Sequence, residues 1–179
     1  SDVCSSDLLF NLSISQGKFP SKLKTSRTIP LFKSGDSTSC DNYRPISLLN
    51  SVSKILEKFV ANKLTDHLNG FNLIYTHQYG FLKGKSTVHN LLNLTNFVAK
   101  EINDKKYVVG VFFDLRKAFD VVPHKLLLRK LKYLGVTGNA LRWFESYLSD
   151  RYQIVDIDGC FSERLLIEIG VLQIGRAHV

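Results

Sequence analysis

The chain has 179 residues, of which 44% are hydrophobic and 22% are charged. This composition supports a packed core and excludes wholesale disorder, and no run of about 18 apolar residues predicts a transmembrane helix. Lys and Arg number 24 against 16 Asp and Glu, and the net charge of +8 favours a polyanionic partner such as nucleic acid. The three cysteines, Cys4, Cys40 and Cys160, include no close pair, which excludes a disulfide scaffold and a cysteine zinc site.

The two ends of the chain match each other at the level of DNA. Residues 2–7 can be encoded by a string whose reverse complement translates as residues 174–179. A sequencing adapter read from both sides of one fragment produces such a match. Residues 1–8 and 174–179 are therefore interpreted as adapter-derived and non-native, and they are left out of fold reasoning. The remainder is expected to be an excerpt of a longer reading frame.

The first half of the chain predicts a short helix, a hairpin and two longer helices. Residues 9–24 favour a short helix followed by a basic loop. Residues 28–32 predict an edge strand, because Pro30 cannot donate to a central ladder, and residues 43–48 predict the return strand. Apolar residues at helical spacing then predict two amphipathic helices, one beginning at Ser51 and ending near Gly70, the other carrying Val88, Leu91, Leu92 and Val98.

The second half predicts a buried strand, two helices and a hairpin. Residues 107–113 form a continuous apolar run whose length and β-branched content favour a strand buried on both faces. Helices are predicted from Pro123 to about residue 134 and over residues 140–147. A hairpin is predicted over residues 153–169 with its turn at Asp158 and Gly159. The irregular alternation of helices and strands indicates an α+β fold.

Asp114 is the strongest candidate for chemistry. A carboxylate at the end of a buried strand projects from a rigid base, and its charge requires a cationic partner. The same pattern fits an N-cap of a following helix equally well. Asp120 is better explained as an N-cap or turn residue.

The surrounding residues resemble a known family. Residues 111–124, VFFDLRKAFDVVPH, closely resemble the catalytic palm motif of reverse transcriptases from non-LTR (LINE-type) retrotransposons. Residues 41–49, DNYRPISLL, and residues 78–87, QYGFLKGKST, resemble two fingers motifs of that family, and residues 170–173, GVLQ, resemble the first half of a further motif. Four motifs in family order, over about residues 17–173, make the resemblance specific.

The resemblance implies a truncated right-hand polymerase fold in which helices pack on a small antiparallel sheet. It implies a fingers-like region with an N-terminal extension over residues 9–102 and a partial palm over residues 103–173. It also implies RNA-directed DNA synthesis on an RNA template and a DNA primer from deoxynucleoside triphosphates, inside the cell in the nucleus or cytoplasm. Two Mg²⁺ ions, with Mn²⁺ as a substitute, would be held by Asp114 and the Leu115 carbonyl.

The resemblance further implies roles for residues outside the metal site. Arg44 and Lys33 would contact the triphosphate, Phe119 would stack under the sugar and exclude a 2′-hydroxyl, and Gln173 would lie near the nascent pair. Contacts to the nucleic acid are implied for three residues of the second fingers motif: Gln78, Lys83 and Lys85.

The sequence also departs from the family pattern. Leu172 stands where the family has Pro, and the later motif with paired aspartates is absent from the chain. One carboxylate cannot hold two divalent ions, so the fragment itself is expected to be inactive. The alternative is a non-catalytic basic nucleic-acid-binding remnant of a decayed or repurposed retroelement. An RNA-dependent RNA polymerase is disfavoured by the bulk of Phe119.

Overall fold

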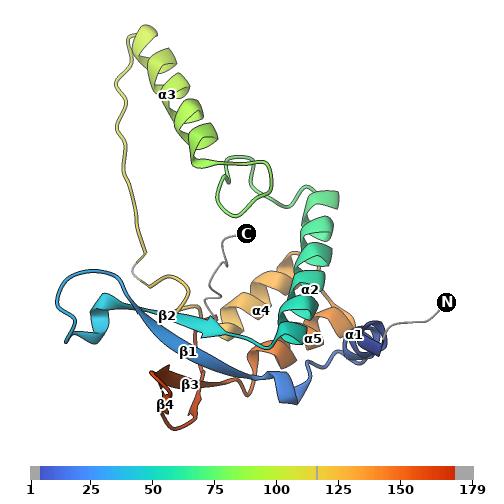
Figure 1. Cartoon of the computed structure of the whole chain (residues 1–179). Coiled ribbons are helices and arrows are strands. Elements are labelled where there is room, and N and C mark those ends of the chain that lie inside the picture. The colour runs from blue at the N-terminus through green and yellow to red at the C-terminus, as the bar shows by residue number, and fades with distance from the viewer. Residues whose placement is uncertain (1–4, 116, 172–179) are drawn as a thin grey trace. The chain divides into compact units, whose positions relative to one another are not determined.

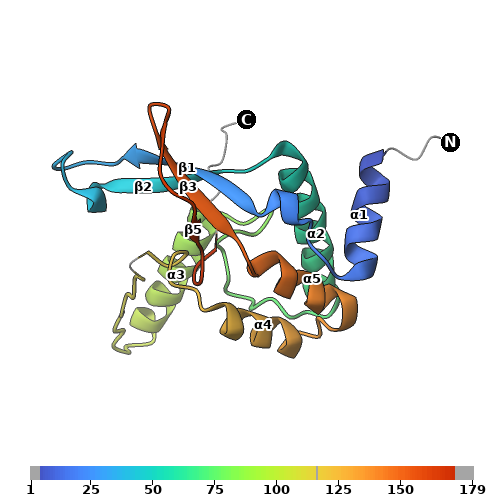
Figure 2. The ribbon, with the colours of Figure 1, turned by 90° about the horizontal axis from the view of Figure 1, so that it is seen from below.

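The computed structural model describes residues 5–115 and 117–171, with side chains from residue 8 onward. These residues form five α-helices and a five-stranded mixed sheet (Figures 1 and 2). The chain divides into two compact units, residues 1–63 with 117–179 and residues 64–116. The α+β class predicted from the sequence is confirmed.

The first unit holds the sheet. Strands β1 (Thr25–Phe32) and β2 (Tyr43–Leu48) form an antiparallel hairpin in which Leu31 lies opposite Arg44. Strand β3 (Tyr152–Ile157) runs parallel to β1 and pairs antiparallel with the short strands β4 (Cys160–Phe161) and β5 (Leu165–Leu166). The order β2-β1-β3-β4 is therefore mixed, and the expectation of a purely antiparallel sheet was wrong.

Strand β1 contains Pro30 although it lies between two other strands, β2 and β3. Only Thr25–Thr28 of β1 pair with β3, whereas pairing with β2 continues to Phe32. At Pro30 the strand is thus an edge on the β3 side, where no ladder hydrogen bond is lost. The edge-strand prediction holds locally, but not for β1 as a whole.

An aromatic core lies between three helices of the first unit. Helices α1 (Ser5–Gln16), α2 (Ser51–Gly70) and α5 (Gly138–Leu148) contribute Phe10, Leu56 and Trp143, all buried, and Phe19 joins them from the segment before β1. The Trp143 ring stacks on Tyr147 with centroids 5.3 Å apart. Its indole N–H donates to the Ser13 hydroxyl over 3.0 Å, so the buried polar group is satisfied.

The remaining predicted helices are also confirmed. Helix α4 covers His124–Tyr133, and α3 covers Thr87–Asn103 with Ser86 as its N-cap, whose hydroxyl accepts from the His89 amide. Among the described residues of the second unit none is buried, so the apolar stripe of α3 stays exposed there. Ser86 caps α3, but among the described residues the helix has no buried apolar face to stabilise it by packing.

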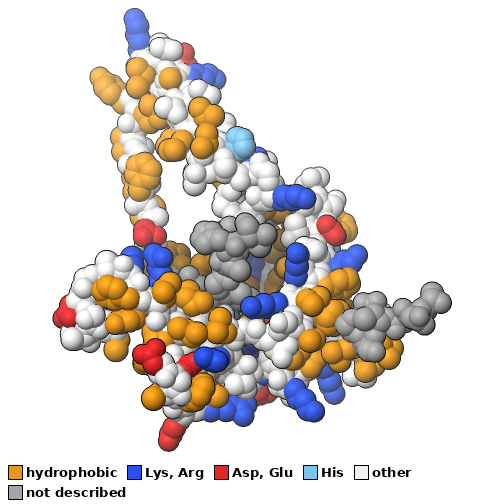
Figure 3. Space-filling view, in the orientation of Figure 1, with side chains coloured by type: hydrophobic (Ala, Val, Ile, Leu, Met, Phe, Trp, Pro, Cys, Tyr) orange, Lys and Arg blue, Asp and Glu red, His pale blue; other side chains and the backbone are white. Residues whose placement is uncertain are grey.

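The predicted buried strand at residues 107–113 is wrong. The segment is extended (Figure 1) but pairs with none of the described strands. Its side chains are exposed except for the half-buried Val108, with Phe112 at 86% and Phe113 at 90%, and apolar side chains lie along it in the space-filling view (Figure 3). Apolar β-branched residues favour a strand only where a partner accepts the backbone hydrogen bonds. Because the described chain supplies no such partner, the composition of the segment alone did not produce a strand.

Candidate functional site

Asp114 and Leu115 follow the extended segment of the second unit. Both side chains are exposed, so Asp114 is not presented from a buried strand as the sequence predicted. Because the carboxylate is exposed, burial does not require a cationic partner for it in this position. Lys33, Arg44 and Phe119 belong instead to the first unit.

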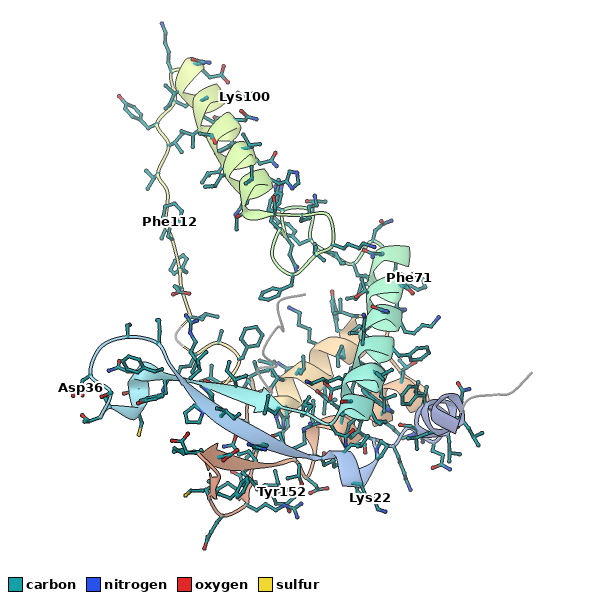
Figure 4. All side chains as sticks on the ribbon, in the orientation of Figure 1. Lys22, Asp36, Phe71, Lys100, Phe112 and Tyr152 are labelled. Atoms are coloured by element: carbon teal, nitrogen blue, oxygen red, sulfur yellow. The ribbon has the colours of Figure 1, made fainter. Side chains whose placement is uncertain are left out.

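The β1–β2 hairpin carries Lys33 and Arg44. Its loop is ordered by local hydrogen bonds, in which the amide and the hydroxyl of Thr38 donate to the Asp36 carboxylate at 2.9 and 2.8 Å. These bonds hold the pKa of Asp36 below its usual value. The Asn42 side-chain amide donates to the Asp36 carbonyl over 2.8 Å. Figure 4 marks the position of Asp36 in this loop. The hairpin is therefore a defined support for the two basic side chains.

Both basic residues project from the end of this hairpin that carries the loop. Lys33 directly follows β1, and its amide donates to the Asn42 carbonyl over 2.8 Å, so it lies beside the loop base and not at its tip. Arg44 is the second residue of β2 and is exposed. Because both cations are exposed, the free chain pays no cost for burying their charges. Both remain available to an anionic ligand.

Phe119 lies in a turn that is joined to the segment before residue 172. The Val171 amide donates to the Phe119 carbonyl over 2.8 Å, and the Gly170 amide donates to the Val122 carbonyl over 2.9 Å. The Nε2 atom of the His124 ring lies 2.7 Å from the Gly170 carbonyl oxygen. The structure thus brings together two motifs that are about fifty residues apart in sequence.

Gly170 permits this approach. Its φ is +85°, and a Cβ there would lie 2.7 Å from the Asp120 carbonyl oxygen. Only glycine fits both the backbone conformation and the contact. Gln173, the remaining predicted nucleotide contact, lies outside the described residues.

A cavity of about 470 Å³ opens beside this junction in the first unit. Strands β1, β2 and β3, the turn and the segment before residue 172 line it, with polar groups from Thr28, Ser47, Asp120, Gln153 and Glu168. The Thr28 hydroxyl is buried and has no hydrogen-bond partner among the described residues. A lining that combines these polar groups with apolar side chains suits a small ligand with hydrogen-bonding edges.

Lys117 and Asp41 were missed by the sequence reasoning. The Lys117 ammonium contacts the Asp41 carboxylate at 2.9 Å and joins the turn before Phe119 to the loop of the β1–β2 hairpin. Both side chains are about half exposed, so the pair contributes little to stability. It nevertheless shows that the turn lies beside the hairpin loop. Both residues belong to motifs that the sequence analysis identified, and this membership could have drawn attention to them. Their separation of 76 residues gave no indication that they are in contact.

The second fingers motif forms an irregular loop between α2 and α3. The Gln78 side-chain amide donates to the Gly80 carbonyl over 3.4 Å, and the Lys85 ammonium lies 5.1 Å from the centroid of the Tyr79 ring. Lys83 and Lys85 are exposed, and Gly84 has a φ of +77°. The loop therefore presents two exposed cations, one of them, Lys85, near an aromatic ring. Such an arrangement suits a phosphate backbone and a stacked base.

Neither a metal-binding cluster nor a membrane-spanning helix occurs within the described part of the chain. Across residues 5–115 and 117–171, no three His, Cys, Asp or Glu side chains gather closely enough to hold a metal ion. Asp114 and the Leu115 carbonyl have the oxygen chemistry that Mg²⁺ prefers, but they form only part of a ligand set. No helix in the described part of the chain combines the length and hydropathy needed to cross a membrane.

Comparison with known proteins agrees with the motifs. Residues 31–173 match the family described as reverse transcriptase (RNA-dependent DNA polymerase). The chain is 35% identical over 173 residues to the probable RNA-directed DNA polymerase from transposon BS of Drosophila melanogaster, a match that covers 93% of the chain and 18% of that protein. It is 36% identical over 167 residues to the RNA-directed DNA polymerase from mobile element jockey of the same species, with the same coverage.

A more distant relative extends the comparison to other retroelements. The Pol polyprotein of type-1 retrotransposable element R2 from Popillia japonica is 26% identical over 163 residues, covering 90% of the chain and 22% of that protein. The chain therefore belongs to the reverse transcriptase family, and its relatives are polymerases of non-LTR retrotransposons. It spans about a fifth of the length of the curated relatives it matches.

Proposed function

We propose that the chain is the fingers and part of the palm of a non-LTR retrotransposon polymerase that copies RNA into DNA from a DNA primer. The observation that carries the proposal is the junction in the first unit, where the Val171 amide binds the Phe119 carbonyl and so joins two polymerase motifs. In this proposal the fingers cover residues 9–102 and the palm covers residues 103–173 of a right-hand fold. The full protein acts in the nucleus or cytoplasm.

The incoming deoxynucleoside triphosphate binds the first unit. Arg44 and Lys33 contact its phosphates from the β1–β2 hairpin, where the planar guanidinium binds two oxygens at once. Phe119 packs under the sugar and excludes a 2′-hydroxyl, and Gln173 lies near the base pair. The cavity lined by Thr28, Ser47 and Asp120 supports this assignment, because it lies beside the turn that carries Phe119.

The metal site is the incomplete part of the proposal. Asp114 and the Leu115 carbonyl are the ligands that this chain would contribute to Mg²⁺ or Mn²⁺, which when bound activates the primer hydroxyl and offsets charge on the phosphates. Several anionic ligands are needed to hold such an ion against water. Since the described residues contain no cluster of three candidate ligands, we expect the chain on its own to bind nucleic acid without extending a primer.

The nucleic acid contacts the second unit through the loop between α2 and α3. Lys83 and Lys85 neutralise backbone phosphates, and Gln78 helps to hold the loop through its hydrogen bond to Gly80. A non-catalytic basic module is the second candidate function. The same incomplete ligand set and the net charge of +8 favour it.

A chimera separates the two candidates. Residues 31–173 replace the matching segment of the jockey polymerase, and primer extension is measured on an RNA template with Mg²⁺. We expect extension in the chimera, a loss of about 10³-fold or more in its Asp114→Ala variant, and little change in Asp104→Ala, which removes an exposed carboxylate of the same unit. Hybrid binding without extension by a folded chimera would support the non-catalytic module instead.

A further inference from the structure

Helix α4 of the first unit carries an exposed cationic surface. It contains four cations, Lys125, Arg129, Lys130 and Lys132, and no acidic residue, whereas each of the other four described α-helices contains at least one Asp or Glu. All four cationic residues are exposed. Within the part of the chain that the structure describes, none of their side chains forms an ion pair or a hydrogen bond. These cations are therefore available to an external anion.

Three of the cations form one stripe along the helix. Lys125, Arg129 and Lys132 stand at positions i, i+4 and i+7, which share a face of an α-helix. The helix packs against α5 (Figure 2), and its buried Leu131 marks the inward face, so the stripe is turned to solvent. With a rise of 1.5 Å per residue the stripe is about 10 Å long, which suits two or three successive phosphates of a nucleic-acid strand.

Helix formation does not account for this stripe. Lys130 and Lys132 lie in the last turn, where the helix dipole favours cations. Lys125 lies in the first turn, where the dipole disfavours a cation, and Arg129 repels it from four residues away. The charges of Lys125 and Arg129 thus weaken the isolated helix, and a bound polyanion would turn both into favourable contacts.

Tyr133 adds an aromatic ring to the outer face of α4. It is 89% exposed, more than any other large hydrophobic residue described in the first unit. Tyr133 follows Arg129 by four positions and Lys130 by three, so its ring shares the face that carries both cations. Exposed rings among cations bind single strands, because the cations contact phosphates and the ring stacks on an unpaired base. A duplex keeps its bases stacked inside and offers the ring no such partner.

We propose that the outer face of α4 binds single-stranded nucleic acid. The three cations of the stripe contact backbone phosphates, and the Tyr133 ring stacks on an unpaired base. An acidic protein segment would satisfy the cations but gain little from the exposed ring, so nucleic acid is the favoured partner. This face is distinct from the β1–β2 hairpin and from the loop between α2 and α3, to which the proposed function assigns its contacts. Because the proposal concerns binding alone, it does not depend on whether the full protein is a polymerase.

Fluorescence anisotropy with a labelled single-stranded RNA of about 12 nucleotides measures the stripe. The full chain carries Lys83→Ala and Lys85→Ala throughout, so that the loop between α2 and α3 does not contribute. On this background we expect the triple variant to reduce the slope of log affinity against log salt by roughly 2, since each single-strand phosphate contact contributes about 0.7. The triple variant combines Lys125→Ala, Arg129→Ala and Lys132→Ala.

A second triple variant is the matched control. It removes three exposed cations from separate places in the first unit, by Lys18→Ala, Lys22→Ala and Lys54→Ala. We expect it to change the slope much less, because its charges do not form a stripe. The α4 variant removes like-charge pairs and adds alanine, so its midpoint of urea unfolding is expected to equal or exceed that of the background. Lost binding is thereby separated from lost folding.

Tyr133 provides a second readout, which charge alone does not move. We expect Tyr133→Ala to weaken binding of the single strand roughly 5- to 100-fold and to leave binding of the same strand in a duplex nearly unchanged, because only an unpaired base stacks on the ring. Tyr133→Phe keeps the ring and is expected to retain the affinity. The proposal is overturned by an equal fall in slope for both triple variants, by unchanged or equally weakened binding of strand and duplex in Tyr133→Ala, or by a polyglutamate peptide that displaces the RNA as well as unlabelled RNA does.

Discussion

Glu57 is half-buried on α2, next to polar groups from α2 itself, from α5 and from the residues between α5 and β3. Its carboxylate accepts a hydrogen bond of 2.8 Å from the Ser53 hydroxyl. The buried Arg151 guanidinium lies 4.5 Å from the centroid of the Tyr147 ring and donates to the Tyr147 carbonyl at 3.3 Å. Burial raises the pKa of Glu57, and the Ser53 hydroxyl and the Arg151 charge offset part of the rise.

This cluster makes stability depend on pH. Because the folded pKa of Glu57 lies above its ordinary value of 4.5, the folded state binds more protons than the unfolded state above that pH. The free energy of unfolding therefore falls as pH rises from about 4.5 through the folded pKa. We expect Glu57→Gln to remove this decline, as measured by urea unfolding between about pH 4 and 8. A wild type that gains stability relative to Glu57→Gln over this interval would contradict the expectation.

At the scale of the element, the turn containing residues 117–120 and the segment before residue 172 depend on one glycine. Gly170→Ala adds a Cβ that would lie 2.7 Å from the Asp120 carbonyl oxygen, at a φ of +85°. Backbone atoms cannot yield as a side chain would, so the segment is expected to detach. We expect hydrogen exchange of the Val171 amide to accelerate by about tenfold or more.

Gly159→Ala is the matched control for that change. Gly159 has a φ of +86°, but a Cβ there meets nothing within 4 Å. Its substitution carries only the cost of a left-handed backbone, about 1 kcal/mol. Exchange of the Val171 amide is therefore expected to stay unchanged. Equal acceleration in both variants would show that the close contact at Asp120 is unimportant.

The elements that the sequence predicted well are those defined by local rules. The boundaries of α2, α4 and α5 follow from apolar spacing and from Pro123, and the hairpin of β1 and β2 follows from its turn residues. The predicted hairpin after residue 153 was only partly right. Its second strand is divided into β4 and β5, which pair with β3 in registers that differ by one residue.

At the scale of the whole molecule, the two units differ in what stabilises them. The first has an aromatic core around Trp143, and the described residues of the second include no buried side chain. A unit without a core has low local stability and gains most from binding a partner. The nucleic-acid contacts proposed for the second unit would therefore depend on charge and stacking and not on a rigid surface.

The strength of those contacts is measurable through salt. The double variant Lys83→Ala with Lys85→Ala is expected to reduce the slope of log affinity against log salt by roughly 1 to 2 for an RNA–DNA hybrid. The matched control is Lys100→Ala with Lys105→Ala, two exposed lysines outside the loop between α2 and α3, for which we expect a smaller change. Fluorescence anisotropy at several salt concentrations measures both slopes. Identical slopes in the two double variants would argue for a diffuse electrostatic attraction.

The sequence by itself determined the family, the α+β class, the helices and the identity of the motif residues, because local spacing and motif order are written in neighbouring positions. Only the tertiary structure decided that β1 pairs in parallel with β3, that Lys117 reaches Asp41, and that Gly170 lies against Asp120. These contacts join residues far apart in the chain. Only the tertiary structure, likewise, showed that residues 107–113 have no partner strand within the described residues. An apolar run records a preference for burial, and whether burial occurs depends on what the rest of the chain brings to it.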